Sequence, residues 1–128
     1  MAKFLVVDDS LTMRRIVVNA LKTQGFDDVI EACDGKDAVA KILSEGAQFV
    51  ITDWNMPEMN GLELAKWLRS SPQYENIPVL MITTRGNKDD VIEAMKARVN
   101  NYIVKPFTPQ GLKEKIEQVL KTVELKSA

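Results

Sequence analysis

Short apolar runs alternate with amphipathic segments five times along the chain, and this alternation constrains the fold more than any other feature. The runs are rich in β-branched residues and predict strands buried on both faces, over 3–8, 29–33, 48–53, 78–83 and 101–105. The segments between them carry apolar residues at helical spacing and predict helices, over 12–22, 37–43, 62–68, 90–97 and 109–125. Five strand–helix units in succession, a (βα)5 pattern, predict an α/β fold with a doubly wound, five-stranded parallel sheet.

Composition narrows the classes of function that the chain can have. Its 128 residues fit one domain, expected over 1–128, and 17 basic against 18 acidic residues give no indication of nucleic-acid or membrane binding. No apolar stretch approaches the roughly 20 residues of a spanning helix, and no signal peptide is recognised, so we expect a cytoplasmic protein. The chain has no histidine, which excludes histidine bases and zinc ligands. Its single cysteine, Cys33, is expected to be a small buried thiol.

Charged and hydroxyl side chains follow the ends of four predicted strands. Asp8 and Asp9 follow the first strand, Asp53 ends the third, Thr83 ends the fourth and Lys105 ends the fifth. Parallel strands present their carboxyl ends at one edge of a sheet, where open α/β folds bind ligands, so these side chains are expected to share one pocket. Three carboxylates so close together remain ionised only if a cation joins them, which predicts a hard divalent metal, Mg²⁺.

Each of these residues alone has an ordinary structural explanation. Adjacent aspartates are common helix caps, loop aspartates form turns, and most lysines are solvated. Together they fit phosphoryl transfer, in which a carboxylate attacks phosphorus while a metal and an ammonium neutralise the phosphoryl oxygens. The sequence contains no glycine-rich nucleotide loop, so ATP bound by this chain is not the expected donor. A phosphorylated carboxylate of finite lifetime suits a switch better than a metabolic catalyst.

Three segments carry a specific family resemblance that extends over essentially the whole chain. Phe4–Ser10, Ile51–Gly61 and Asn101–Phe107 resemble the signature segments of two-component response-regulator receiver domains. The resemblance implies a flavodoxin-like sheet with strand order 2-1-3-4-5. Within the family, the single-domain form and the segment Asp53–Pro57 are most similar to the chemotaxis regulators.

The resemblance also implies roles for the residues at the sheet edge. Asp53 would accept a phosphoryl group from a histidine autokinase. Asp9, Asp53 and the backbone carbonyl of Asn55 would ligate Mg²⁺ directly, and Asp8 would do so through a water. Lys105 would hold a phosphoryl oxygen, and its bond to Pro106 would be cis. Such a protein assists only its own phosphorylation and dephosphorylation, and is not a metabolic enzyme.

The switch itself is expected to couple this edge to a binding surface on the fourth helix, the fifth strand and the fifth helix. Thr83 would move toward the phosphoryl group and Tyr102 would turn inward to fill the space that it leaves. In chemotaxis regulators this surface binds the flagellar motor switch. The residues expected to form it here are Lys88, Val91, Met95, Val104, Lys115 and Gln118. The assignment of Val91 and Met95 assumes that Ile92 faces the core; the alternative is that both are core residues.

The chain departs from the usual pattern of the family at Arg98 and Thr84, and Arg85 is a further residue of interest near the site. Arg98 stands where glycine is common, and a left-handed backbone there would cost about 1 kcal/mol or more relative to glycine. Thr84 stands where a small residue is usual and narrows the path expected for Tyr102. Arg85 lies near the expected approach of hydrolytic water, where its charge and bulk either alter the phosphoryl lifetime or point into solvent.

Other functions are compatible with parts of this pattern. Within the family, a phosphate sink or an adaptor regulator differs from a motor-binding protein only in its partners. A Mg²⁺-dependent phosphoaspartate phosphatase is more distant, because that class needs Asp-x-Asp after the first strand where this chain has Asp8-Asp9-Ser10. A flavin carrier needs a phosphate-binding loop at the same place, and adjacent aspartates would repel a phosphate. We expect a monomer; a dephosphorylating partner is left open.

Overall fold

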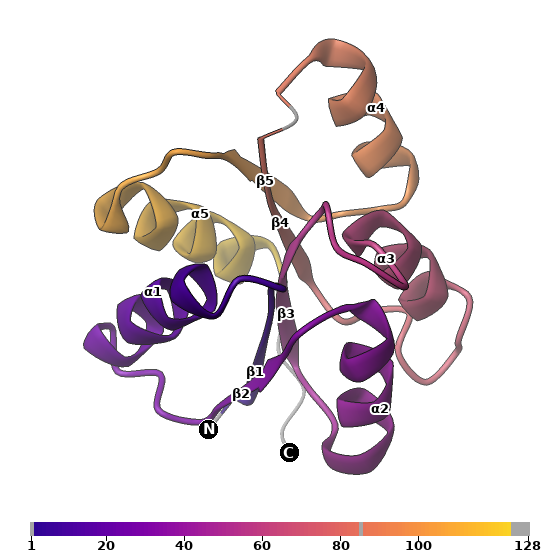
Figure 1. The fold of residues 1–128 in the computed structure, drawn as a ribbon, viewed down its shortest axis with the longest axis horizontal. Helices are drawn as coiled ribbons and strands as arrows, with labels where there is room; N and C mark the ends of the chain where they lie inside the picture. The colour runs from indigo at the N-terminus through magenta and orange to yellow at the C-terminus, as the bar shows by residue number, and fades with distance from the viewer. Residues whose placement is uncertain (1, 85, 124–128) are drawn as a thin grey trace.

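The computed structural model describes residues 2–84 and 86–123, and it confirms the predicted α/β fold (Figure 1). Strands and helices alternate along the chain. The strands are β1 Phe4–Val7, β2 Val29–Ala32, β3 Phe49–Asp53, β4 Val79–Thr83 and β5 Asn101–Val104. The helices are α1 Leu11–Thr23, α2 Gly35–Glu45, α3 Gly61–Arg69, α4 Lys88–Lys96 and α5 Pro109–Thr122. The predicted strands extend past the observed ones by at most one residue at either end.

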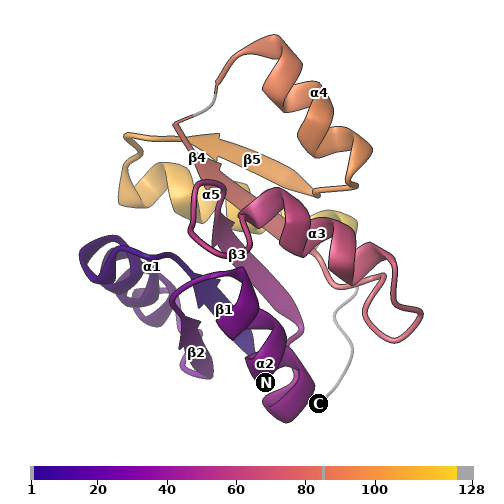
Figure 2. The same cartoon turned by 45° about the vertical axis from the view of Figure 1, so that its right-hand side comes forward.

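The five strands form one parallel sheet in the order β2-β1-β3-β4-β5, as the family resemblance implied (Figure 2). The pairing register places Val7 of β1 beside Thr52 of β3, and Asp53 beside Ile82 of β4. Thr83 of β4 pairs in turn with Val104 of β5. The carboxyl ends of β1, β3, β4 and β5 are therefore level with one another along one edge of the sheet.

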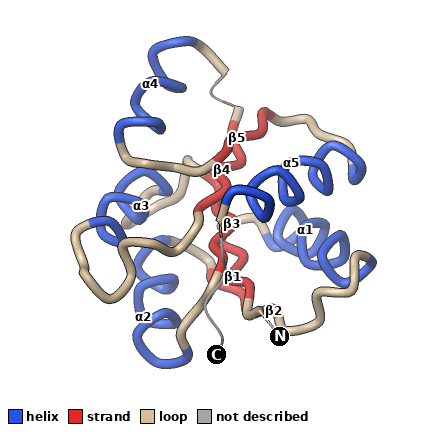
Figure 3. Tube along the Cα trace, turned by 180° about the vertical axis from the view of Figure 1, so that it is seen from behind, coloured by secondary structure: helices blue, strands red, loops and turns tan. Residues whose placement is uncertain are grey.

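Helices cover both faces of the sheet, which explains why the strands are almost entirely apolar. Helices α1 and α5 lie on one face, and α2, α3 and α4 lie on the other (Figures 1 and 3). Alternate residues of each strand point to opposite faces, so Phe4 and Val6 pack toward α1 and α5, while Leu5 and Val7 pack toward α2 and α3. Two separate apolar clusters result, one on each side of the sheet.

Each helix begins with a polar cap directly after the loop that leaves the sheet edge. In every case the side chain of the cap accepts a hydrogen bond from a backbone amide of the first turn. The caps are Ser10, Asp34, Asn60, Asn87 and Thr108. In α3 the Glu63 side chain also accepts a bond from the Asn60 amide, which completes a capping box. These caps fix where α1, α3, α4 and α5 start, next to the candidate site.

The helices are buried to very different extents, and two expectations about buried side chains are wrong. Within α4, all of whose residues are described, Ala94 is the one buried residue, whereas α3 buries four. Ile92 is 42% exposed and does not face the core, because Ala94 takes that side of the helix. Cys33 is exposed because β2 ends at Ala32, so its side chain does not follow the strand into the core.

Candidate functional site

The predicted site residues meet at the carboxyl edge of the sheet. Asp8 and Asp9 follow β1, Asp53 is the last residue of β3, Thr83 is the last residue of β4, and Lys105 follows β5. One carboxylate oxygen from each of the three aspartates lies within 4.8 Å of the other two. This confirms the predicted acidic cluster, which we define as Asp8, Asp9 and Asp53.

A single lysine balances the acidic cluster among the ion pairs of the described residues. The Lys105 Nζ lies 3.2 Å from Asp53 Oδ1 and 3.7 Å from Asp8 Oδ2. The Lys105 backbone amide donates to the Thr83 carbonyl at 2.7 Å, which ties the end of β5 to the end of β4. The Lys105–Pro106 peptide bond is cis, as the family resemblance implied. The Lys105 ammonium therefore lies beside Asp53. One positive charge does not balance three carboxylates, so the acidic cluster keeps an excess of negative charge.

Burial makes that excess of negative charge unfavourable in free energy. Asp8 and Asp53 are 4% and 7% exposed, while Asp9 is exposed. Burial raises the pKa of Asp53 above its ordinary value, although the Lys105 ammonium opposes the shift. Burial also raises the pKa of Asp8, and the charges of Asp53 and Asp9 add to it, against the Ser10 amide and Lys105. A second cation next to Asp8 and Asp53 would oppose both upward pKa shifts, because it favours the charged carboxylates.

The donor set fits a hard divalent cation. Three carboxylates that converge within 4.8 Å offer oxygen ligands, which Mg²⁺ prefers, and the part of the chain that the structure describes contains no other such group. A bound Mg²⁺ would add two positive charges next to Lys105. The charge deficit and the oxygen chemistry of the acidic cluster both fit this ion.

Comparison with known proteins agrees with the geometry. The family model for the response regulator receiver domain matches residues 4–117. A chemotaxis protein CheY homolog of Campylobacter jejuni is 60% identical over 94% of this chain and 93% of its own. The chain belongs to the response regulator receiver domain family.

Solved receiver structures share the fold. Chemotaxis response regulator CheY4 of Vibrio cholerae has a TM-score of 0.87 and 38% identity, and the match covers 94% of this chain and 99% of that one. The Mn²⁺-bound form of response regulator Rcp1 has a TM-score of 0.81 and 29% identity, with 99% of this chain and 100% of that one covered. Both likenesses extend over nearly the whole receiver.

The remaining residues predicted at this edge occupy different environments. Thr83 is fully buried at the end of β4, and Tyr102 is half-buried on β5. Asn55 is exposed two residues beyond Asp53, in the loop that leads to α3. Thr84 is exposed, and Arg85 lies outside the described residues.

The residues expected on the binding surface are mostly exposed. Met95 and Val104 are 46% and 42% exposed, so the alternative that Met95 is a core residue is wrong. Val91 is half-buried on α4 and Lys88 is exposed at its first turn. On α5, Lys115 is half-buried and Gln118 is exposed, and Gln118 Oε1 accepts a hydrogen bond from Asn101. The exposed Ile92 adds an apolar side chain that the sequence analysis had assigned to the core.

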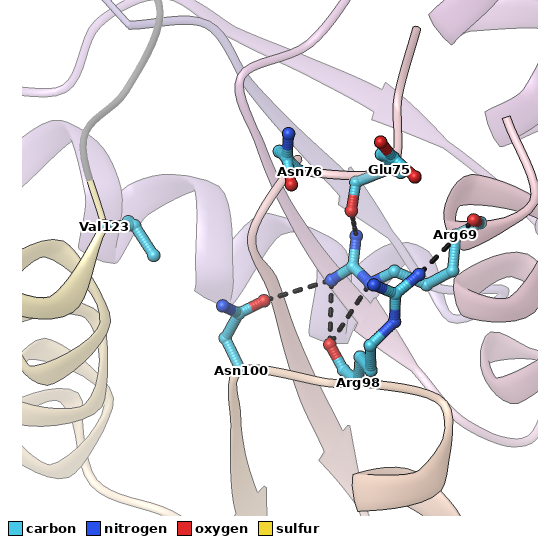
Figure 4. A pocket seen from close by; sticks show the side chains of 6 residues that line it. All are labelled: Arg69, Glu75, Asn76, Arg98, Asn100 and Val123. Carbon is cyan, nitrogen blue, oxygen red and sulfur yellow. Dashed lines mark hydrogen bonds between the residues drawn. The ribbon is translucent and has the colours of Figure 1, made fainter. Parts of the chain in front are cut away.

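The structure shows a second charged region that the sequence analysis missed, at the opposite edge of the sheet (Figure 4). A cavity of about 320 Å³ opens there. Its lining residues are Arg69, Glu75, Asn76, Arg98, Asn100 and Val123. The Arg69 guanidinium donates five hydrogen bonds, to the carbonyls of Glu75 and Ile77, twice to the Arg98 carbonyl, and to Asn100 Oδ1. All five of its N–H donors are used, so Arg69 joins chain segments and has no donor left for a ligand.

Arg98 completes that region and explains one departure from the family pattern. Its φ is +59°, the left-handed conformation in which glycine is favoured. The Arg98 carbonyl accepts two bonds from Arg69, and its guanidinium donates to the Arg69 carbonyl at 3.4 Å. A glycine at this turn would keep the two carbonyl contacts, so the guanidinium bond to Arg69 is the contact that is specific to arginine here.

The part of the chain that the structure describes includes no helix with the length and apolar character needed to span a membrane.

Proposed function

We propose that this receiver is a phosphorylation-activated switch in bacterial chemotaxis and that Asp53 is its phosphoryl acceptor. The observation that carries the assignment of Asp53 is that its carboxylate lies within the acidic cluster and, at 3.2 Å, nearer to the Lys105 ammonium than Asp8 does at 3.7 Å. The 60% identity to a CheY homolog supports chemotaxis as the pathway. We further propose that residues 1–128 act as one receiver domain.

Asp9, Asp53 and the backbone carbonyl of Asn55 are proposed to ligate Mg²⁺, with Asp8 acting through a water. The ion supplies charge neutralisation to the phosphoryl oxygens when it is bound. The acidic cluster and the Mn²⁺-bound Rcp1 relative support this assignment.

The chain's own groups perform the transfer by position and charge. An Asp53 carboxylate oxygen attacks phosphorus, a P–O bond forms, and the P–N bond to the donor histidine breaks. Lys105, already paired with Asp53, stays beside the new phosphoryl group and neutralises one of its oxygens. The Thr83 hydroxyl, buried at the end of the adjacent strand, is proposed to donate to another. The receiver assists this transfer and the later hydrolysis, and otherwise acts as a signalling protein.

The output is proposed to be a change in protein-binding affinity on the surface formed by α4, β5 and α5. Tyr102, half-buried on β5, is proposed to turn inward when Thr83 moves toward the phosphoryl group. Helix α4 buries a single alanine, so a shift of this helix exposes little apolar surface and costs little free energy. The exposed Met95 and Val104 then provide apolar contacts for a partner.

The proposed partners are a CheA-like histidine autokinase, which supplies the phosphoryl group, and the flagellar motor switch protein, which reads it. A phosphatase partner would shorten the signal. We propose that the receiver works as a cytoplasmic monomer. A phosphate sink is the second candidate, and it shares the site while lacking phosphorylation-dependent binding to the motor.

The chemistry is tested by incubating the protein with acetyl phosphate and Mg²⁺ and measuring its intact mass. The parent is expected to gain one phosphoryl group, and Asp53→Asn is expected to gain none. A parent that gains no phosphoryl mass, or an Asp53→Asn variant that gains the same mass, would contradict the assignment.

The output is tested by pull-down of the purified flagellar motor switch protein with phosphorylated and unphosphorylated receiver. Phosphorylation is expected to increase retention, and Met95→Ala is expected to reduce it. Leu43→Ala is a matched control, because Leu43 is 62% exposed on α2, on another part of the surface. Equal retention with and without phosphorylation would favour the phosphate sink.

A further inference from the structure

Two adjacent arginines of α1 contact the same glutamate, but only one of them also reaches the acidic cluster. The Arg14 Nε donates to Glu31 Oε1 at 2.9 Å, and its Nη1 donates to the Asp8 backbone carbonyl at 2.7 Å. The Arg15 Nε lies 3.4 Å from the same Glu31 oxygen. Arg14 is 15% exposed and Arg15 is 64% exposed, so solvent competes far less with the contacts of Arg14.

The contact from Arg14 is one of several that hold Asp8 in place, besides its ion pair with Lys105. The Asp8 amide donates to the Ala32 carbonyl at 3.1 Å, and Asp8 Oδ1 accepts from the Ser10 amide at 2.9 Å. The carbonyl that Arg14 holds belongs to the peptide unit between Asp8 and Asp9. Because a peptide unit is planar, fixing the carbonyl also fixes the Asp9 amide and the direction in which Asp9 leaves the strand.

Glu31 explains how the Arg14 guanidinium can lie so near the acidic cluster without pairing with the carboxylates of the cluster. The Arg14 guanidinium pairs with the Glu31 carboxylate at the end of β2, and the ion pairs of the described residues show no Arg14 contact with a carboxylate of the cluster. The Lys41 Nζ donates to the Glu31 carbonyl at 3.2 Å and joins α2 to the same position. The charge of Arg14 is thus directed away from Asp8 and Asp9, while its second N–H group orders their backbone.

We propose that Arg14 is a positioning residue for the Mg²⁺ site, which aligns the Asp8–Asp9 peptide while Glu31 orients its guanidinium. This inference rests on the proposed function, because it assumes that the acidic cluster binds Mg²⁺. It predicts that Arg14 changes metal affinity without touching the metal.

Isothermal titration calorimetry of Mg²⁺ into the parent, Arg14→Ala and Arg15→Ala tests the proposal. Arg14→Ala is expected to weaken binding about tenfold, the usual scale for a residue that orients a metal ligand, while Arg15→Ala leaves affinity unchanged. Arg15→Ala is the matched control, since it removes a cation from the same Glu31 oxygen and makes no contact with Asp8.

A double-variant cycle examines the role of Glu31. Glu31→Ala leaves Arg14 without its orienting partner and is expected to weaken Mg²⁺ binding as well. The double variant Arg14→Ala/Glu31→Ala is expected to be no weaker than Arg14→Ala alone, because the two residues act through one contact. If the losses of Mg²⁺ affinity in the two single variants add up in the double variant, the proposal that Glu31 acts through Arg14 would be overturned.

A merely structural role for Arg14 makes different predictions. It would lower the melting temperature of the metal-free protein and leave Mg²⁺ affinity unchanged. Positioning predicts faster hydrogen exchange and a shifted NMR resonance at the Asp9 amide in the metal-free protein, with Arg15→Ala unaffected. If Arg14→Ala fails to fold, Arg14→Lys replaces it, and an intermediate loss of affinity is expected because an ammonium lacks the planar fork.

The outcomes separate this inference from the proposed function. A parent that takes up no Mg²⁺ and gains no phosphoryl mass would remove both. A parent that binds Mg²⁺ and is phosphorylated, with an Arg14→Ala variant of equal affinity, would overturn the inference alone.

Discussion

Gly61, the first residue of α3, contacts the backbone of the proposed phosphoryl acceptor so closely that a single methyl group there should damage the site. A Cβ at this position would overlap the Asp53 carbonyl oxygen and lie 2.9 Å from Met81 Sδ. The Asp53 carbonyl is backbone at the end of the central strand, so it cannot rotate away as a side chain does. Gly61→Ala therefore forces either the end of β3 or the start of α3 to move.

The size of the stability loss in Gly61→Ala depends on how firmly the end of β3 and the start of α3 are held. The Gly61 amide donates to the Trp54 carbonyl at 2.9 Å, and the Asn60–Glu63 capping box fixes the start of the helix. Restoring ordinary van der Waals separation requires a displacement on the order of 1 Å. Overpacking of a rigid site costs about 3 kcal/mol, so we expect Gly61→Ala to lower the free energy of unfolding by that amount.

Urea denaturation of the parent and the variant measures this loss, and Mg²⁺ titration measures its effect on the site. The control is Gly86→Ala, whose Cβ would lie 3.4 Å from Val104 Cγ2, an ordinary contact, and should change stability by less than about 0.5 kcal/mol. Mg²⁺ affinity is expected to fall in Gly61→Ala because Asp53 moves with its carbonyl. Equal stability and equal affinity of Gly61→Ala and the parent would refute the argument.

Three further predictions concern charge. In the absence of metal, Asp53→Asn should be more stable than the parent at pH 7.5, because burial raises the folded-state pKa of Asp53 above its ordinary value of 3.8. The parent loses stability as the pH rises from the ordinary pKa of 3.8 through the raised folded-state pKa, whereas the Asn variant does not titrate, so the difference in stability should vanish toward pH 3.8. Urea denaturation at pH 3.8 and pH 7.5 measures this difference. A parent that is as stable as the variant at pH 7.5, or more stable, would contradict the prediction. Mg²⁺ at one hundred times its dissociation constant should stabilise the parent by about 2.7 kcal/mol, reversibly with a chelator, and thermal melts that do not respond would contradict binding to the folded state. Arg69→Ala should lower the free energy of unfolding by about 3 kcal/mol because four acceptors lose the five hydrogen bonds of a charged donor, and Arg69→Lys should not restore it; full rescue by lysine would show that charge alone matters.

The sheet and the acidic cluster were predictable because local patterns specify them. The strands have continuous apolar runs, and a parallel sheet places their carboxyl ends at one edge, so the position of Asp53 and Lys105 in sequence nearly determines their position in space. Helix starts were similarly accessible, because Asn60 and Thr108 are standard caps.

One error occurred where apolar residues lie on more than one side of a helix. Ile92 and Ala94 lie on opposite sides of α4, and the side that carries the smaller Ala94 is buried while Ile92 is exposed. Periodicity ranks residues by apolar character and carries no information on the space available between helix and sheet. Arg14 and Arg69 escaped notice because the contacts that tie them to Asp8 and to the loop before β4 have backbone carbonyls as acceptors, which every residue possesses and which no sequence pattern marks.

The two charged regions of the fold differ in how far the chain itself satisfies their charges. At the edge beside Arg69, two guanidinium groups lie close together, yet Arg69 directs all its donors to carbonyl oxygens and side-chain amide oxygen of the chain itself. The Arg69 guanidinium is therefore fully hydrogen-bonded by acceptors of the chain itself. At the opposite edge, three carboxylates face one lysine, and burial raises the pKa of two of them. Because the described residues leave this negative charge unbalanced, the acidic cluster fits a divalent cation, which is the basis of the proposed Mg²⁺ and phosphoryl chemistry at Asp53.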